Sequence, residues 1–92
     1  MMNQDHTTDI LTERGKQYGL FISQAGLSQE LKTVMRDHQG WSALGTDMQE
    51  ALELIAMKIS RILNGNPNHL DSWDDIAGYA RLVADRLRGV TR

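Results

Sequence analysis

The sequence predicts an all-α protein: a four-helix bundle-like domain with a C-terminal antiparallel helical hairpin. Of its 92 residues 40% are hydrophobic, but only two are Trp, two Tyr and one Phe. The interior must therefore be built from aliphatic side chains and Met, which favours packed helices. Apolar residues recur at i, i+3, i+4 and i+7 over two long C-terminal segments, as in helices with one buried face. Short polar turns join such helices into hairpins.

The C-terminal hairpin is predicted from residue 46 onward. The stretch TDMQ at 46–49 is a capping box that begins a helix. NGNP at 64–67 ends it with a left-handed residue followed by a proline. The next helix begins at Asp71 or Ser72 and ends at Gly89. The expected buried stripes are Met48, Ala51, Leu52, Ile55, Ala56, Ile59, Ile62 and Leu63 on the first helix, and Trp73, Ile76, Ala77, Ala80, Val83, Ala84 and Leu87 on the second.

The N-terminal half predicts two further helices. A threonine at position 7 or 8 can cap a helix that runs to about residue 16, and two glycines bracket the following KQY. A longer helix is expected over residues 20–38. The connector WSALG at 41–45 follows, and its Trp41 and Leu44 are expected to cover the end of the bundle.

Length, composition and charge exclude several classes of protein. A chain of 92 residues predicts a single domain, residues 1–92, whose small core is marginal alone, so we expect a homo-oligomer formed through the hairpins. The lack of Cys excludes disulfides and thiolate zinc sites. No signal-peptide core or membrane-spanning run is present, and a net charge of −2 gives no footprint for DNA or RNA. We therefore expect a cytoplasmic protein with neither a membrane nor a nucleic acid as partner.

The stretch KISRILNGNPNHLDSWDDIAGYARL, residues 58–82, places bases before the hairpin turn and acids after it. In an antiparallel hairpin with this turn, residues whose numbers sum to about 135 lie side by side. Lys58 and Arg61 therefore face Asp71 and Asp75. This network can be a salt bridge between neighbouring helices, which contributes about 0 to 1 kcal/mol, or it can be a nucleotide pocket.

In a nucleotide pocket, the two basic side chains would donate to phosphate and an aspartate would accept from a ribose hydroxyl or a base amine. Tyr79 or Trp73 would offer a stacking face. Gly78 favours this interpretation, because a glycine inside a helix costs about 1 kcal/mol relative to alanine and calls for close packing or a ligand.

A magnesium site is the alternative use of the acids. Glu50 and Glu53 on one helix, with Asp71 and Asp75 on the next, have the carboxylate spacing of helical phosphohydrolases. Several of these acids also lie in first helical turns, where negative charge is favourable without any ion. Within one chain Glu53 and Asp75 would be about 10 Å apart along the bundle, so we predict no metal and no cofactor in a single protomer, although a second subunit could complete a Mg²⁺ site.

A second candidate binding cluster is TERGKQYGLF, which sets Arg14, Lys16 and Tyr18 beside two glycines. A basic and aromatic group next to flexible backbone can bind phosphate and base, and it can equally be a solvated helix end. No Ser, His and Asp set and no glycine-rich phosphate loop is present, so no catalytic residue is predicted.

The stretches LTERGKQYGLF, EALELIAMKISRILNG and DSWDDIAGYARL together resemble an uncharacterised family of small helical proteins encoded mainly by bacteriophages and prophages. The resemblance covers roughly residues 10–87. Its most specific residues are Arg14, Gly15, Tyr18, Gly19, Lys58, Arg61, Asp71, Trp73, Asp75, Gly78 and Tyr79. It implies a location in the cytoplasm of a bacterial host.

More distantly, the chain is similar to the MazG-like all-α nucleotide pyrophosphohydrolases, whose hallmark is a Glu-x-x-Glu helix followed by a Glu-x-x-Asp helix. That resemblance implies nucleotides, magnesium and dimers or tetramers. Ser72 stands where the glutamate before Asp75 would be, and the facing positions are Met57, Lys58 and Arg61. The resemblance therefore implies a nucleotide pocket more than hydrolysis.

Three functions follow from these observations. The first is a non-enzymatic phage protein that binds or sequesters a nucleotide or cyclic nucleotide signal and so antagonises host defence. The second is a magnesium-dependent pyrophosphohydrolase, and the third is a structural or protein-binding helical module. For the first, the expected ligand-binding residues are Arg14, Tyr18, Lys58, Arg61, Asp71, Asp75 and Tyr79.

Overall fold

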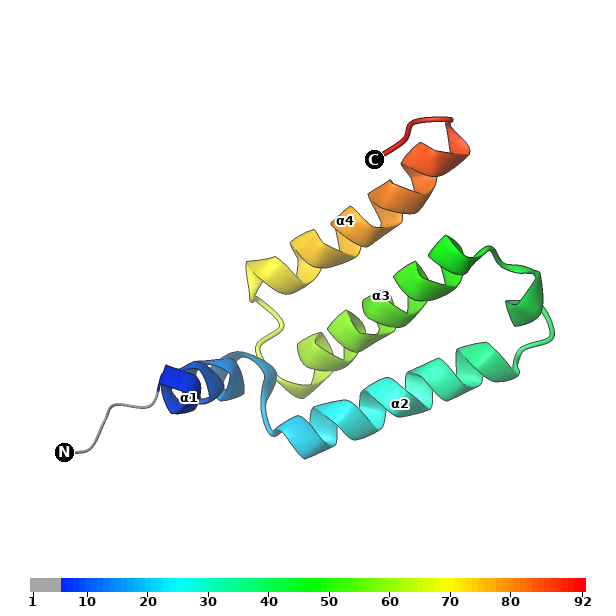
Figure 1. Cartoon of the computed structure of the whole chain (residues 1–92). Helices are drawn as coiled ribbons and strands as arrows, with labels where there is room; N and C mark the ends of the chain where they lie inside the picture. Colours follow the sequence, from blue (N-terminus) through cyan, green and yellow to red (C-terminus); the bar gives the residue numbers. More distant parts are fainter. Residues whose placement is uncertain (1–5) are drawn as a thin grey trace.

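A computed structural model describes residues 6–92 and shows an all-helical, bundle-like protein. Its elements are α1 (His6–Tyr18), α2 (Phe21–Asp37), the short 3-10 helix η1 (Trp41–Ala43), α3 (Thr46–Asn64) and α4 (Leu70–Leu87) (Figure 1). The all-α prediction is confirmed, and the helix ends lie within about two residues of those expected from capping and turn residues. None of the helices in the described part of the chain is long and apolar enough to cross a membrane.

Helices α2, α3 and α4 form one layer, with α3 in the middle (Figure 1). Two contacts show that α2 runs antiparallel to α3: Gln24 bonds to Ser60, and Arg36, later in α2, bonds to Glu53, earlier in α3. Lys58 pairs with Asp75, whereas Asp47, earlier in α3, pairs with Arg86, later in α4. Helices α3 and α4 therefore form the expected antiparallel hairpin. Helix α1 leaves this layer at the start of α2 (Figure 1).

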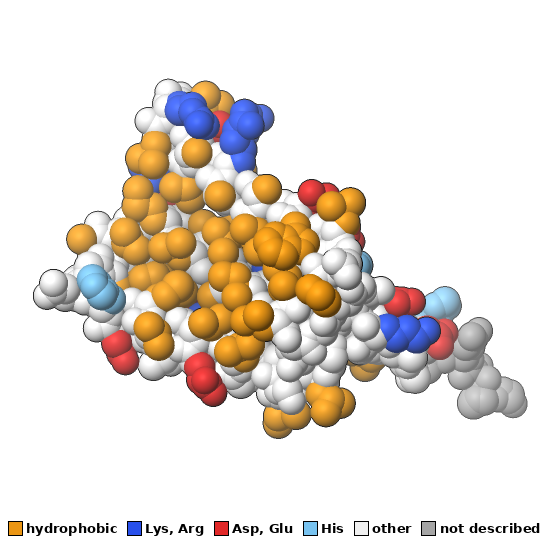
Figure 2. Space-filling view, turned by 180° about the vertical axis from the view of Figure 1, so that it is seen from behind, with side chains coloured by type: hydrophobic (Ala, Val, Ile, Leu, Met, Phe, Trp, Pro, Cys, Tyr) orange, Lys and Arg blue, Asp and Glu red, His pale blue; other side chains and the backbone are white. Residues whose placement is uncertain are grey.

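The predicted buried stripes are only partly buried. Ala51 and Ala56 are the only hydrophobic residues of the described chain that are buried. Five large side chains of the stripes are between 37% and 68% exposed: Leu52, Ile59, Leu63, Trp73 and Leu87. The helical period is correct, but three helices in a single layer cover only their flanks, so the prediction of full burial was wrong for the exposed part of the stripes. A broad hydrophobic face is the result (Figure 2).

The predicted capping box at the start of α3 is not formed. The N-cap is Gly45, without a side-chain cap, so Thr46 already lies inside the first turn. The side-chain amide of Gln49 donates instead to the carbonyl oxygen of Trp41 at 3.0 Å. Asp47 Oδ1 accepts from the Met48 amide at 2.9 Å. The preceding 3-10 turn thus supplies an acceptor that local sequence patterns do not include.

The turn after α3 joins the turn between α1 and α2. Asn66 N donates to the carbonyl oxygen of Gln17 at 2.6 Å, and Asn64 Nδ2 donates to that of Tyr18 at 2.8 Å. We call this contact between residues 17–20 and 64–66 the junction. Gly65 has φ −140°, so the predicted left-handed stop is wrong here. Glycine is needed because a side chain would overlap the backbone of Gln17 and Tyr18.

Replacing Gly65 with Ala should open the junction. A Cβ at this position would collide with rigid backbone of the other turn, and forced overpacking typically costs about 1 to 3 kcal/mol. We expect a lower midpoint of urea denaturation. Gly26→Ala is the matched control, because Gly26 lies in α2 with open space around it and alanine there should stabilise the helix by up to about 1 kcal/mol. Equal midpoints for the two variants would contradict this account.

Candidate ligand-binding site

The candidate site is centred on a stacked pair next to the junction. The guanidinium carbon of Arg61, in the last turn of α3, lies 4.3 Å from the ring centroid of Tyr18, the last residue of α1. The same tyrosine ring meets His69 edge to face, with centroids 5.6 Å apart. A guanidinium over an aromatic ring is attracted by the ring quadrupole. The junction holds the carbonyl group of Tyr18. The aromatic ring that Arg61 contacts is therefore kept close to the end of α3.

One donor of Arg61 has no acceptor. Its Nε atom is buried and has no hydrogen-bond partner among residues 6–92. A guanidinium cannot lose its charge at physiological pH and carries only donors. Leaving a buried donor unpaired costs about 1 to 3 kcal/mol. The local structure therefore favours an acceptor, and most of all an anion, beside this nitrogen.

Arg61 lies between two shallow cavities. The larger, of about 420 Å³, is lined by Leu11, Arg14, Gly15, Tyr18, Gly19, Leu20, Phe21, Gln24 and Arg61. The smaller, of about 270 Å³, shares Phe21, Gln24 and Arg61 and adds Lys32. Of the described residues that line these cavities none is acidic, whereas Arg14, Arg61 and Lys32 are basic. This surface is suited to an anion that also carries a flat or apolar group.

The expected ion pair across the hairpin is present in part. Lys58 Nζ lies 2.7 Å from Asp75 Oδ2, and the exposed fractions of the two side chains are 10% and 44%. Arg61 and Asp71 are not paired, although opposition across the turn was expected. Arg61 points to Tyr18, because three residues along a helix rotate a side chain by about 60° from the direction of Lys58. Asp71 is 77% exposed and lies 3.8 Å from His69.

Tyr79 lies apart from the other predicted ligand-binding residues. It lines a third cavity of about 240 Å³ together with Asp47, Glu50 and Leu54, toward the N-terminal end of α3. Arg61 is near the opposite end of that helix. Gly78 is exposed and a Cβ would meet open space there, so close packing within the chain is not the reason for this glycine.

The acids of the magnesium alternative do not converge in one chain. Glu53 is turned toward α2, where Arg36 holds it at 2.6 Å and 3.1 Å. Hydrogen bonding by Arg36 lowers the pKa of Glu53 below its usual value. Asp75 lies on the other side of α3, paired with Lys58. Within residues 6–92 there is no group of three His, Asp or Glu side chains that could hold a metal ion.

The structure brings together Arg14, Tyr18 and Arg61, which the sequence had divided between two separate clusters. It adds Phe21, Gln24 and Lys32 from α2 and His69 from the turn between α3 and α4, to none of which the sequence assigned a role. No sequence pattern identifies these four, because their proximity depends on the junction between distant turns.

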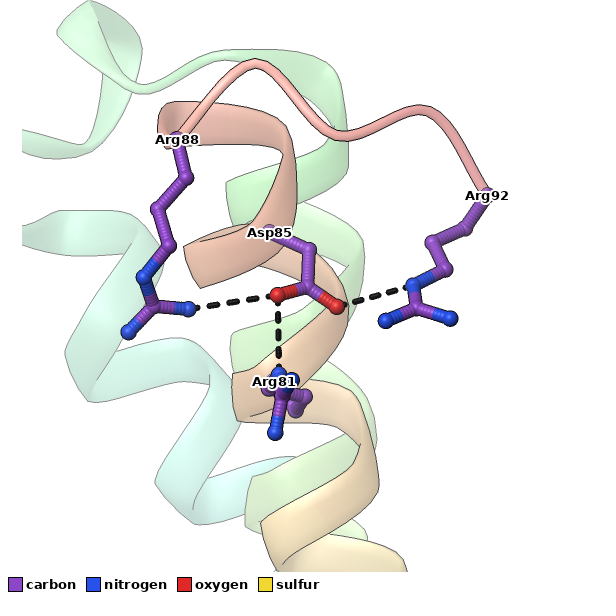
Figure 3. Close-up of polar contacts among 4 residues, drawn as sticks. All are labelled: Arg81, Asp85, Arg88 and Arg92. Carbon is purple, nitrogen blue, oxygen red and sulfur yellow. Dashed lines mark hydrogen bonds and ion pairs between the residues drawn. The ribbon is translucent and has the colours of Figure 1, made fainter.

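Asp85 was also missed. It is 2% exposed, and its carboxylate accepts from Arg81 at 2.8 Å, Arg88 at 3.2 Å and Arg92 at 2.8 Å (Figure 3). Hydrogen bonding by Arg81, followed by that of Arg92, lowers the pKa of Asp85. The i, i+3 and i+4 spacings in ARLVADRLRG could have revealed this cluster. Its role is to fix the last turn of α4.

The fold and the site define a small all-α protein with a cationic and aromatic pocket where the turn between α1 and α2 meets the turn between α3 and α4. The chain belongs to the family described as a domain of unknown function (DUF6378), whose model matches residues 4–87. No curated protein and no solved structure matches the sequence.

Removing the acid of the hairpin ion pair should destabilise the protein. Asp75→Ala would leave the Lys58 ammonium, which is mostly buried, without its carboxylate, and losing a hydrogen bond to a charged group costs about 1.5 to 3 kcal/mol. Chemical denaturation measures the loss. Asp74→Ala is the control, because Asp74 is an exposed neighbour in the same turn. A control as destabilised as Asp75→Ala would show that the ion pair is not the cause.

Replacing Asp85 with Asn should lower the melting temperature in a pH-dependent way. The folded-state pKa lies below the usual value, which is about 3.9 for aspartate. The carboxylate therefore stabilises the fold fully above that value, and its contribution is lost as the pH falls through the folded-state pKa. Thermal melts of wild type and variant should differ at pH 7 and converge below about pH 4. A difference that stays constant down to pH 2 would contradict this assignment.

Proposed function

We propose that the protein binds a phosphate-bearing nucleotide in the pocket formed by Arg14, Tyr18 and Arg61. The observation that supports it most is the buried Nε of Arg61, which lacks an acceptor in the described chain. A phosphate oxygen would supply that acceptor. Charge-assisted hydrogen bonds from a guanidinium to phosphate are short and directional, and Arg61 can form two in parallel.

The second arginine supports a phosphate ligand rather than a single buried water. Arg14 is exposed and lines the same cavity as Arg61, without an acidic residue in the lining. Water satisfies a donor but does not neutralise two positive charges that face one cavity. An anion satisfies the donor and neutralises the charges.

The aromatic lining supports a base. Phe21 is 78% exposed at the rim of the pocket and is free to stack on a planar group, an interaction that contributes about 1 to 3 kcal/mol per base. A cavity of about 420 Å³ falls within the usual range for small-molecule ligands, about 300 to 1,000 Å³. Phosphate at Arg61 and a base at Phe21 would use two residues that line this same cavity.

The proposed role is retention of the ligand rather than catalysis. Glu53, an acid of the magnesium alternative, is neutralised by Arg36, and Asp75 is paired with Lys58. The resemblance to phage and prophage proteins supports sequestration of a nucleotide or cyclic nucleotide signal in the bacterial cytoplasm, as an antagonist of host defence.

Calorimetry against nucleoside triphosphates, cyclic mononucleotides and cyclic dinucleotides tests the proposal. At least one should bind, and Arg61→Met should weaken it by about 10- to 100-fold, as expected for a lost charged hydrogen bond. Arg61→Lys should also bind more weakly, because an ammonium cannot reproduce the planar fork. Lys16→Gln, an exposed change on the same helix as Arg14, is the control and should bind like wild type.

Chromatography of each nucleotide after incubation separates the remaining functions. An unchanged nucleotide that coelutes with the protein supports retention. Release of pyrophosphate with Mg²⁺ would establish the hydrolase instead. No heat from any nucleotide, with none retained, would leave the structural module.

A further inference from the structure

The exposed hydrophobic face lies along α3 and α4. On α3 it is formed by Met48, Leu52, Ile55 and Ile59, which follow one another at i, i+4, i+7 and i+11, and on α4 it includes Ala80 and Val83. We call these six residues the apolar face. They line or adjoin a groove of about 270 Å³ between the two helices, and the residues of its lining are all apolar. Figure 2 shows many hydrophobic side chains gathered on one side of the molecule, with charged side chains mainly at its edges.

The chain exposes more surface than a folded monomer of its mass does. Its accessible area is 6602 Å², whereas about 5,400 Å² is typical of a compact protein of this size. Its radius of gyration is 16.0 Å, compared with about 12 Å for a compact domain. The excess area of the whole chain, helix α1 included, is about 1,200 Å², compared with the approximately 800 Å² that each partner contributes to a stable protein interface.

The surface that covers the apolar side chains of α3 and α4 has to be available when the chain folds. With Ala51 and Ala56 as the only buried hydrophobic residues of the described chain, one protomer lacks the apolar burial that offsets the entropy of ordering its backbone. A second copy of the chain is present wherever the first is made, in equal amount. Two-fold dimers are also the commonest closed assemblies, since one self-complementary surface serves both subunits.

We infer that a second copy of the chain covers the apolar face, so that α3 and α4 of two protomers form a four-helix core. The chemistry of the groove suits self-association, because an uncharged lining meets its own copy without electrostatic repulsion. Ala51 and Ala80 in the groove lining are small enough for the helices to approach closely.

This dimer leaves the ligand pocket open. Met57 and Arg61 line the smaller cavity beside α2. Ile55 and Ile59 of the apolar face each precede one of these residues by two positions. Two residues along a helix rotate the side chain by about 200°, so Arg61 and the apolar face are on opposite sides of α3. Assembly and ligand binding can therefore be tested separately.

Sedimentation equilibrium and light scattering of the full chain test the inference. The wild type should show twice the chain mass of 10.4 kDa and a melting temperature that rises with protein concentration. Leu52→Glu and Ile59→Glu should weaken dimerisation by at least tenfold. Ile22→Glu is the control, since Ile22 is 81% exposed at the start of α2, and it should remain dimeric.

If the glutamate variants do not fold, the milder Ile59→Ala tests the same interface. Its dimer should dissociate at a higher protein concentration than that of the wild type, and it should keep a helical circular dichroism spectrum. A wild-type mass of one chain at every concentration, with a concentration-independent melting temperature, would overturn the inference. Glutamate variants that dimerise as tightly as Ile22→Glu would overturn it as well.

Discussion

The junction between the α1–α2 turn and the α3–α4 turn determines where α1 and the candidate site lie. Residues 17–20, which end α1 and lead into α2, meet residues 64–66 at the end of α3 through backbone and asparagine hydrogen bonds. The sequence separation of Asn64 and Tyr18 is 46 residues. These bonds replace the water that would otherwise satisfy exposed carbonyl groups at the helix ends. Without them α1 would have few contacts, and Tyr18 would not lie under Arg61. The pocket is therefore a consequence of how two turns satisfy each other's polar groups.

Electrostatics then separates the basic residues into two groups. Lys58, Arg36 and Arg86 each have a carboxylate within 2.7 Å, and those contacts bind neighbouring helices together. Arg61 has an aromatic ring instead of an acid, and one of its donors is unpaired in the described chain. A basic side chain that the fold holds in place but does not neutralise differs physically from one that completes a salt bridge. This distinction, and not the number of positive charges, identifies the candidate site.

The sequence predicts local structure better than it predicts what surrounds it. Helical periodicity located the helices and their apolar faces, and hairpin geometry correctly opposed Lys58 to Asp75. The sequence-based prediction overestimated burial, because the helical period shows which face is apolar and not whether anything covers that face. It also missed the contact of Arg61 with Tyr18, since a stacking pair between distant turns has no sequence spacing. The predicted capping box does not form because the side-chain amide of Gln49 donates instead to the carbonyl oxygen of Trp41, in the preceding 3-10 turn.

Helix α3 connects all of these features, because each of its sides contacts something different. Glu53 and Ser60 bond to α2, Lys58 bonds to α4, and Arg61 faces the pocket. Leu52 and Ile59 face outward, and within a single protomer they remain over one third exposed. A helix with polar contacts on two flanks is held in register by those contacts, which leaves its remaining faces available for a partner and a ligand. Single-layer geometry thus explains both why one chain buries so little hydrophobic area and why Arg61 borders open cavities.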